Sequence, residues 1–532
     1  MRLGITLVAL VAAAAAAPDY LALVDLPADR DVFDVTDLGI PVLMPLDKSC
    51  LVRAESRDLD MLDAAGFGFR LLDDNPADKQ YVFVMPGPAL SPATIARYGT
   101  VLAESQDGYV LRTTDDGIRG LNTLQVELAG ISMHPLAPRT PASSPCPAAV
   151  DDSLVRELVG RVSADTVESL LVRMRRFVTR YSETDSCRRA MEWVRSRFEA
   201  WGCSTFLDTF RADYAPNAVG IKRGTSNPDA IFVVCGHTDA TSEIPFTLTP
   251  GSEDNASGTA AVMELCRATA DMEFENTVWF IGFAGEEQGL VGSDSLARRA
   301  RDRGDSIVLS VNFDMISYGR ENRDTIVIYG ARQPPGSEHW VDFFIAQADT
   351  FTVLKRRKTM EYIPQARSDH YSFWKYGFPA IRGGYSDRTP HYHTTGDTIG
   401  PLYYAQCGTN NIPMQAEVIK ALVATIAKLG GAYLPVGVEE QPRPALPRLL
   451  GVFPTVGPAP VSIRLSRPLD RTSTIDVYDA AGSLVRRLDS HGRTTVSWDG
   501  TDHSGGRLPS GIYLFRTTGP GHPSVARAVL TR

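Results

Sequence analysis

Histidine and carboxylate side chains follow one apolar stretch of this sequence after another. The apolar run Ala230–Cys235 leads directly into His237 and Asp239. A charged cluster at the end of a buried strand costs desolvation energy unless something compensates it, and a metal ion would do so. Residues of the same chemistry recur further on: Glu253 and Asp254 before a small-residue helix, Glu286 and Glu287 after Thr277–Ala284, Asp314 after Ile307–Phe313, and His391 and His393 after Phe378–Ile381. The set predicts a metal site.

Short apolar runs and helix patterns alternate over residues 151–435, as in the helix patterns Gly258–Ala270 and Trp340–Ala348. Buried strands that alternate with helices predict an α/β fold, with a twisted, mostly parallel sheet covered by helices on both faces. Ligand sites in open α/β sheets form at the carboxyl ends of the strands. We therefore expect the acids and histidines to converge on one crevice.

The ligand types indicate which metal the crevice would hold. Two histidines with three carboxylates suit two zinc ions better than one structural zinc, because structural zinc favours closed, cysteine-rich sites. Two metal ions about 3.5–4 Å apart need one bridging carboxylate, and they lower the pKa of a shared water toward neutrality. A further carboxylate must remain off the metals to accept the proton of that water. The residues thus predict two Zn²⁺ per chain.

Six motifs at these positions, taken together, resemble those of a known family. They are GHTD, EDNASG, GEEQGLVGS, NFDM, SDHYSF and HYHTTGDT, and they span roughly residues 170–430. The chain resembles the co-catalytic di-zinc exopeptidases, which include secreted bacterial leucyl-type aminopeptidases, glutamate carboxypeptidase and glutaminyl cyclase. The resemblance implies the zinc exopeptidase fold and a metallopeptidase activity on peptide substrates, with an aminopeptidase as the leading expectation.

The resemblance also implies a ligand for each zinc ion. Asp254 corresponds to the carboxylate that bridges the two ions. Glu287 and His393 would complete the coordination of one ion, and His237 and Asp314 that of the other. Another histidine, two residues before His393, is the rival to it, and the TTGDT that follows favours His393.

Two further roles come from the same resemblance. Glu286 would be the general base that deprotonates the attacking water and later passes the proton to the leaving amine. Asp239 would hold the imidazole of His237 from behind and fix its tautomer. The family pattern also implies a cis peptide bond between Asp254 and Asn255.

The group that stabilises the oxyanion is a separate assignment. In the aminopeptidase pattern a tyrosine stands three residues before the Ser-Asp-His stretch, where this sequence has Gln365. Tyr392 fits the carboxypeptidase-like arrangement, and we expect it to take this role, with Tyr362 as the next candidate.

Length and composition bound the rest of the chain. Its 532 residues exceed one compact core, and a net charge of −9 with mixed signs favours neither nucleic acid nor an anionic membrane as partner. The first residues carry one arginine, an apolar run and small residues at a plausible signal-peptide cleavage site. Residues 1–17 are therefore expected to be a signal peptide of a secreted or cell-surface bacterial protein, without a membrane span. Seven cysteines without CxxC spacing are not a disulfide framework.

The remaining segments flank the peptidase-like region 151–435. Residues 19–133 read as a small α+β domain with a weak internal duplication in two βββαβ-like halves, a pro-segment or a binding module, and 134–150 as a linker. A second linker, 436–447, leads to short strand candidates over 448–532 that predict a β-sandwich. Its stretches Ser473–Gly482, Trp498–Gly500 and Pro509–Tyr513 are similar to the immunoglobulin-like domain of flagellar hook-capping proteins and secretion-sorting tails, which implies contact with the cell surface or the secretion machinery.

Three other functions stay open at this stage. A carboxypeptidase of the same fold would need a basic pocket for the terminal carboxylate of its substrate, and Arg367, Arg382 and Arg388 are near enough in sequence to supply one. A glutaminyl cyclase would use a single zinc, against which the complete set of five ligands argues. A non-catalytic receptor that merely keeps the fold would have no need of Glu286.

Overall fold

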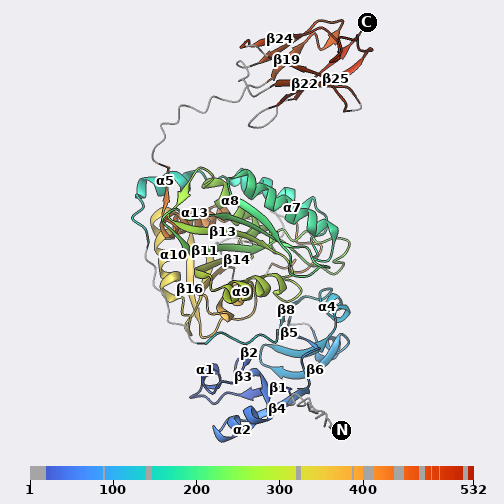
Figure 1. Cartoon of the computed structure of the whole chain (residues 1–532). Coiled ribbons are helices and arrows are strands. Elements are labelled where there is room, and N and C mark those ends of the chain that lie inside the picture. The colour runs from blue at the N-terminus through green and yellow to red at the C-terminus, as the bar shows by residue number, and fades with distance from the viewer. Residues whose placement is uncertain are drawn as a thin grey trace, which may run out of the picture. The chain divides into compact units, whose positions relative to one another are not determined.

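The computed structural model describes residues 19–87, 90–138, 147–318, 325–385, 389–399, 411–435, 449–465, 474–480, 482–489, 492–518 and 525–531. The chain divides into two compact units, Met1–Pro435 and Val436–Arg532 (Figure 1). Within the described ranges, no helix combines the length and hydropathy needed to span a bilayer. The expected signal peptide 1–17, the linker 436–447 and Arg388 lie outside these ranges.

A mixed eight-stranded sheet forms the centre of the first unit. Its strands are β9 (Ser204–Asp208), β10 (Asn217–Lys222), β11 (Asn227–His237), β13 (Asn276–Phe283), β14 (Ser306–Phe313), β15 (Thr325–Ala331), β16 (Lys355–Glu361) and β17 (Ala380–Gly384). They follow the order β16-β15-β17-β14-β11-β13-β10-β9. The middle of the sheet is parallel, because β11 pairs in this way with β13 and β14, and β14 with β17. The antiparallel pairs are β10 with β13 and β9, and β15 with β17. The expected α/β fold is confirmed.

Helices cover both faces of this sheet (Figure 1). Phe232 and Val234 of β11 belong to one core with α8 and α13, whereas Val233 and Cys235 belong to another with α9 and α11. The alternation follows from the two-residue period of a strand. One layer contains α5 (Asp152–Gly160), α6 (Ala164–Arg175), α7 (Asp185–Ala200), α8 (Ala256–Ala268), α10 (Glu338–Phe351) and α13 (Ile412–Gly430), and the other contains α9 (Val291–Arg303) and α11 (His370–Lys375). A two-stranded sheet of β12 (Glu273–Phe274) and β18 (Ala432–Tyr433) lies beside them.

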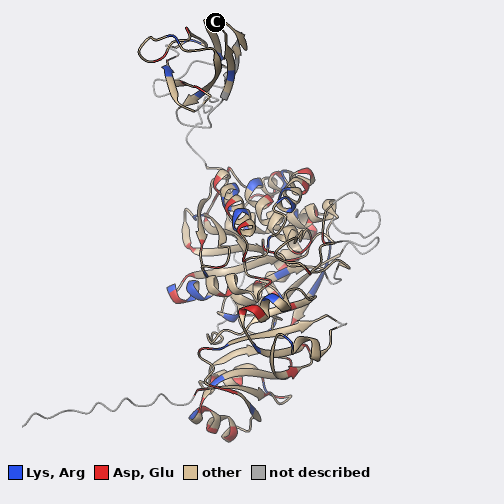
Figure 2. Cartoon of the chain, turned by 90° about the vertical axis from the view of Figure 1, so that its right-hand side faces the viewer, with Lys and Arg blue, Asp and Glu red and all other residues tan. Residues whose placement is uncertain are grey.

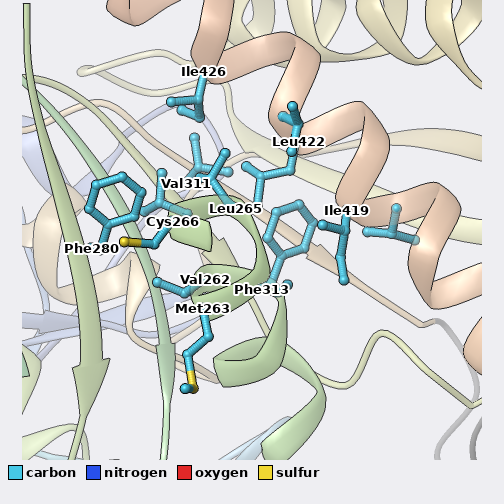
Figure 3. Close-up of a cluster of buried hydrophobic side chains, with 14 of the residues drawn as sticks. Val262, Met263, Leu265, Cys266, Phe280, Val311, Phe313, Ile419, Leu422 and Ile426 are labelled. Atoms are coloured by element: carbon cyan, nitrogen blue, oxygen red, sulfur yellow. The ribbon is translucent and has the colours of Figure 1, made fainter. Parts of the chain in front are cut away.

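The main core lies between α8, α13 and the middle strands (Figure 3). Leu265 of α8 and Leu422 of α13 are fully buried in it, as are Phe280 of β13 and Phe313 of β14. Burying a large apolar side chain contributes about 1.5–3 kcal/mol, so this layer fixes where the strands end and the site begins.

Small residues at the start of α8 allow it to approach the strand ends closely. The Asn255 side chain caps the helix by accepting a hydrogen bond from the Gly258 amide. A Cβ atom at Gly258 would stand 2.1 Å from the carbonyl oxygen of Phe313, and one at Gly236 would stand 2.9 Å from the carbonyl carbon of Gly258. The EDNASG motif is therefore needed for packing as well as for its acidic residues.

Residues 19–130 form two four-stranded sheets with one shared strand order. The first contains β1 (Asp19–Asp25), β2 (Val42–Pro45), β3 (Ser49–Glu55) and β4 (Phe69–Asp74), and the second contains β5 (Gln80–Pro86), β6 (Gly99–Ser105), β7 (Gly108–Thr113) and β8 (Val126–Gly130). Their orders are β2-β3-β1-β4 and β6-β7-β5-β8. Besides α2 (Ser56–Ala64) and α4 (Asp115–Leu121), each half has a short helix after its first strand, α1 (Val32–Asp37) or α3 (Pro92–Ile95). The βββαβ pattern predicted from the sequence did not include these two short helices, because they are too short to show helical periodicity.

Charges of both signs are interspersed over the surface of the helices (Figure 2). On α7, Arg195 pairs with Glu199 four residues on, and on α9, Arg298 pairs with Asp302 in the same way. Such exposed pairs contribute only a few tenths of a kcal/mol each. The mixed signs agree with the composition of the chain.

The second unit consists of two antiparallel-rich sheets around one core. Its strands are β19 (Leu449–Phe453), β20 (Val456–Gly457), β21 (Val461–Leu465), β22 (Thr474–Tyr478), β23 (Leu484–Leu488), β24 (Thr495–Trp498), β25 (Gly511–Thr518) and β26 (Val525–Leu530). The sheets have the orders β19-β21-β24 and β20-β26-β25-β22-β23. Trp498 is 1% exposed among Ile463, Val477 and Phe515, and its indole donates to the carbonyl oxygen of Thr501. The expected strand-rich C-terminal domain is confirmed.

Candidate functional site

The five predicted ligands come together around one carboxylate. Asp254 Oδ1 lies 3.3 Å from His237 Nε2, and Asp254 Oδ2 lies 3.2 Å from His393 Nε2. On the first side, Asp314 Oδ1 is 3.5 Å from His237 Nε2. On the second side, Glu287 Oε2 is 2.9 Å from His393 Nε2. Each oxygen of Asp254 therefore faces one histidine-carboxylate pair, which is the arrangement that a bridging ligand requires.

The elements that carry these residues explain why they meet. His237 is the last residue of β11, and Asp314 directly follows β14, the parallel neighbour of β11. Glu287 lies four residues beyond the end of β13, on the other side of β11, and Asp254 precedes α8. His393 arrives from the loop after β17. As expected, the carboxyl ends of adjacent parallel strands deliver the acids and histidines to one crevice.

The local backbone at the site is unusual in two respects. The peptide bond between Asp254 and Asn255 is cis, as predicted. His393 and Met315 have φ angles of 54° and 58°, in the left-handed region that residues with side chains rarely adopt. Left-handed backbone of this kind persists where the surrounding structure holds it, and it clusters at ligand sites.

Glu286 and Asp239 both lie beside His237. Glu286 Oε2 is 3.8 Å from His237 Nε2, on the same side of the cluster as Asp314. The Nδ1 atom of His237 contacts the backbone oxygen of Asp239 at 3.1 Å, with Asp239 Oδ1 at 3.5 Å. Asp239 Oδ2 accepts hydrogen bonds from the Ser182 hydroxyl at 2.9 Å and the Glu287 amide at 3.2 Å. Asp239 thus links the segments that carry two ligands.

Sequence reasoning missed Asp397, the residue that fixes the loop of the central carboxylate. Its Oδ1 accepts the Glu253 amide and its Oδ2 accepts the Asp254 amide, both at 2.9 Å. Glu253 in turn accepts the Ser317 amide at 3.0 Å, three residues after Asp314. The aspartate of HTTGDT and the first acid of EDNASG were signals within motifs already quoted, but only the folded loops reveal their partners.

The electrostatics of the cluster favour a bound cation. Burial lowers the pKa of an imidazole, yet the carboxylates of Glu287 and Asp254 outweigh it and raise the pKa of His393 to about 10. Burial also raises the pKa of Glu286 well above its usual range, and the nearby charges of Glu287 and Asp314 add to this. A positive charge among these groups would relieve both effects.

Buried oxygen atoms without partners make the same point. Glu287 Oε1 and Asp314 Oδ1 receive no hydrogen bond from the described part of the chain. Buried carboxylate oxygens are costly unless they are hydrogen-bonded or coordinate a metal. With nitrogen and oxygen donors in one cluster, the residues fit zinc.

Of the two oxyanion candidates, the structure brings one to the cluster. Tyr392 lines the cavity, and its ring stacks on that of His393 with centroids 3.7 Å apart. Tyr362 is 55% exposed, its hydroxyl lies 3.3 Å from Asp31 Oδ2, and it lines a different hollow. His391, the rival ligand, is not among the described residues that line the metal cavity.

The cavity at the cluster is small because the N-terminal elements cover it. Its volume is about 30 Å³, and Glu127 and Leu128 of β8 line it together with the ligands. The Gly130 amide donates to the carbonyl oxygen of Gly289 at 3.0 Å, and the Asn122 side chain donates to that of Glu287 at 2.5 Å. β8 and the segment before it therefore lie directly on the GEEQG loop.

Comparison with known proteins agrees with the motifs. Residues 217–411 match the model of Peptidase family M28, and residues 452–520 match that of the FlgD Ig-like domain. A "Probable zinc metalloprotease" of Pyrenophora teres f. teres is 30% identical over 202 residues, 33% of this chain and 43% of that protein. A "Probable leucine aminopeptidase" of Arthroderma otae is 28% identical over 264 residues, 47% of this chain and 70% of that protein. The chain thus spans less than half the length of the first relative.

Solved structures share the fold. The LapA aminopeptidase of Legionella pneumophila superposes with a TM-score of 0.53 at 18% identity, over 66% of this chain and 98% of its own. LapB from the same organism gives a TM-score of 0.51 at 16% identity, over 66% of this chain and 99% of its own. The resemblance inferred from the motifs is confirmed: residues 217–411 are similar to a metallopeptidase family, and residues 452–520 are similar to the FlgD Ig-like domain.

Proposed function

We propose that this chain is an exported aminopeptidase that holds two zinc ions and removes N-terminal residues from peptides. The observation that carries the proposal is the position of Asp254, whose two oxygens face His237 and His393 separately. Asp314 would complete the first zinc site and Glu287 the second. When bound, zinc would supply Lewis acidity that polarises the substrate carbonyl and makes water more acidic.

The protein's own residues would manage the proton. Glu286 lies beside the His237 side of the cluster, where its carboxylate would take the proton from the attacking water. The same carboxyl group would then pass that proton to the leaving amine. Asp239 would keep His237 in place through the Nδ1 side of the ring, and Tyr392, which lines the cavity, would donate a hydrogen bond to the developing oxyanion.

The full chain would be latent while its N-terminal elements cover the cluster. The cavity has a volume of about 30 Å³, whereas sites for small ligands occupy roughly 300–1,000 Å³. Substrate could reach Glu286 only after Glu127 and Leu128 had moved away. This supports the pro-segment interpretation of residues 19–133 over that of a separate binding module.

Replacing Glu286 by Gln tests the catalytic proposal. Once the N-terminal fragment is removed, zinc-loaded Glu286→Gln should lose at least about a hundredfold in turnover of aminoacyl anilides, because general-base catalysis contributes about 10²–10⁴-fold. Metal analysis should still find two zinc ions per chain. Glu192→Gln, an exposed change on α7, is the matched control and should keep full activity. Substantial turnover by Glu286→Gln would refute the assigned role.

Substrate choice and metal content separate this proposal from its rivals. Free aminoacyl anilides should be cleaved, and peptides with a blocked N-terminus should not. The opposite preference would indicate a carboxypeptidase, and a stoichiometry of one zinc would indicate a glutaminyl cyclase.

Latency and export need separate tests. Proteolytic cleavage of the folded chain within 134–150, followed by removal of the N-terminal fragment, should raise activity. Equal activity before and after removal would contradict latency. Export predicts that the intact mass of protein recovered outside the cell lacks residues 1–17, and we propose that the FlgD Ig-like domain contacts the cell surface or the secretion machinery.

A further inference from the structure

Glu127 of β8 reaches the rim of the metal cavity and is bound there by a cation. Its Oε2 lies 2.5 Å from Arg367 Nη1, and its Oε1 lies 3.4 Å from the Tyr392 hydroxyl. The side chain of Glu127 is 15% exposed. Its partners come from the peptidase region, whereas Glu127 itself comes from the N-terminal elements. The contact therefore joins the N-terminal elements to the peptidase region.

A second guanidinium group lines the same cavity. Arg382 of β17 lies there with Asp314, and its guanidinium carbon is 4.6 Å from the centre of the Tyr329 ring. The negative charges of Asp314 and Glu127 both act on Arg382. Arg367 is held by a 2.6 Å hydrogen bond from its Nε to the side-chain oxygen of Gln365. Both cations are thus anchored by the peptidase region itself.

These groups are the positively charged and hydroxyl members of an otherwise acidic cavity. Besides the histidines, its lining includes Asp254, Glu286, Glu287 and Asp314. Two guanidinium groups and a phenol hydroxyl offer the charge-assisted donors that a carboxylate prefers. Glu127 supplies a carboxylate while β8 is in place. If β8 moves away, the two partly buried cations lose the charge of Glu127, which another carboxylate would replace.

We propose that Arg367 and Arg382 form a carboxylate-binding subsite beside the catalytic cluster, and that Glu127 occupies it as an internal mimic of a substrate carboxylate. The inference rests on the proposed peptidase function and names the substrates that the site prefers. These peptides carry a carboxylate close to the scissile amide, either on an acidic side chain or at a free C-terminus. Because Glu127 is tethered, it competes at a high effective concentration.

Binding of propionate to the full, zinc-loaded chain tests the subsite without any turnover. Glu127→Ala removes the carboxylate side chain, so propionate should bind to this variant at least about tenfold more tightly than to the unchanged chain, as measured by calorimetry. Propionamide, which has the same shape without the charge, should not bind. Glu127→Gln keeps the volume of the side chain and removes its charge, so it should give a smaller gain. Glu104→Ala, an exposed change in the same domain, should give none.

The arginines provide the decisive comparison. Adding Arg367→Met or Arg382→Met to Glu127→Ala should weaken propionate binding about tenfold, with zinc content unchanged. Propionate that binds equally well without either arginine would be coordinating zinc, and the subsite would be refuted. Equal propionate affinity of Glu127→Ala and the unchanged chain would also overturn the proposal.

Substrate arms then identify the source of the carboxylate. Once the N-terminal fragment is removed, Glu-anilide should exceed Leu-anilide in kcat/KM if an acidic side chain binds, and Leu-Gly should exceed Leu-Gly-amide if a C-terminus binds. An absence of preference in both pairs would refute the substrate class. An absence of turnover with every substrate would contradict the proposed function and leave the propionate result standing, so the two failures are distinguishable.

Discussion

Asp397→Asn removes a support of the zinc site without replacing a proposed ligand. Asp397 is 2% exposed, and each of its oxygens accepts one backbone amide, from Glu253 and from Asp254, at 2.9 Å. An asparagine offers one oxygen and one NH₂ group. One amide would keep a weaker, neutral hydrogen bond, and the other would face a donor.

The size of the effect follows from these two bonds. A hydrogen bond to a charged group is worth about 1.5–3 kcal/mol, and a buried donor left without an acceptor costs about 1–3 kcal/mol. We therefore expect Asp397→Asn to lower the free energy of unfolding by about 3 kcal/mol. Because the amide of Asp254 loses its anchor, zinc affinity should fall by about 10–100-fold, as is common when the outer partners of metal ligands are changed.

Competition with a chromophoric chelator measures the zinc affinity, and urea denaturation of the zinc-free chain measures stability. Asp294→Asn is the matched control. Asp294 is also an internal anchor, since it accepts hydrogen bonds from Lys375 at 2.9 Å and from the Tyr376 hydroxyl at 3.0 Å, but it is not among the residues that line the metal cavity. It should lower stability and leave zinc affinity unchanged. Wild-type zinc affinity in Asp397→Asn would refute the positioning role.

Three further outcomes are expected. Zinc binding at neutral pH should release protons. Burial lowers the pKa of His393, but Glu287 helps raise it to about 10, so the imidazole must lose a proton before it can bind the metal. Calorimetry in buffers of different ionisation enthalpy would contradict the ligand role if it found no proton release. Asp73→Asn should lower the free energy of unfolding by about 2 kcal/mol at neutral pH. Burial opposes the lowered pKa of Asp73, but hydrogen bonds from a lysine, a tyrosine and an arginine prevail. This stability is therefore present above the pKa of Asp73 in the unfolded chain and is lost as pH falls through its pKa in the folded chain. Urea titrations in which the difference between Asp73→Asn and the unchanged chain persists in acid would contradict this. The Sγ atoms of Cys203 and Cys266 lie 3.4 Å apart, so diamide should join them in a disulfide. Two titratable thiols should be lost, and the free energy of unfolding should rise by about 4 kcal/mol. An unchanged thiol count would contradict this prediction.

The proposed ligands could be predicted because their positions are local. His237 and Asp314 stand at the ends of apolar runs, and a parallel sheet brings such ends together. The cis bond after Asp254 came from the family pattern, since nothing in the spacing alone indicates it. Chain direction and burial thus suffice to place most of the cluster.

The roles of Asp397 and Glu127 could not be predicted in the same way. Asp397 bonds to amides more than 140 positions earlier in the chain, and Glu127 bonds to Arg367 at a separation of 240 positions. Each contact depends on how one loop or strand lies on another element, which no local period encodes. The sequence showed an N-terminal domain, but not that its last strand would cover the cavity. The sequence ranked Tyr392 ahead of Tyr362 as the oxyanion candidate, but only the fold shows that Tyr392 alone of the two lines the metal cavity.

One buried cation explains how so many acids can be held in a closed space before any metal arrives. Arg180 is 1% exposed and donates to the carbonyl oxygens of Thr238, Pro250 and Gly251 at 2.7–2.8 Å. Thr238 follows His237 in the chain, and Pro250 and Gly251 lead into the segment of the central carboxylate. Arginine stays charged even when buried, so its field offsets part of the negative charge while its fork ties the two loops together. Because these anchors fix the loops from behind, zinc binding need not order them, and more of its binding free energy is retained as affinity.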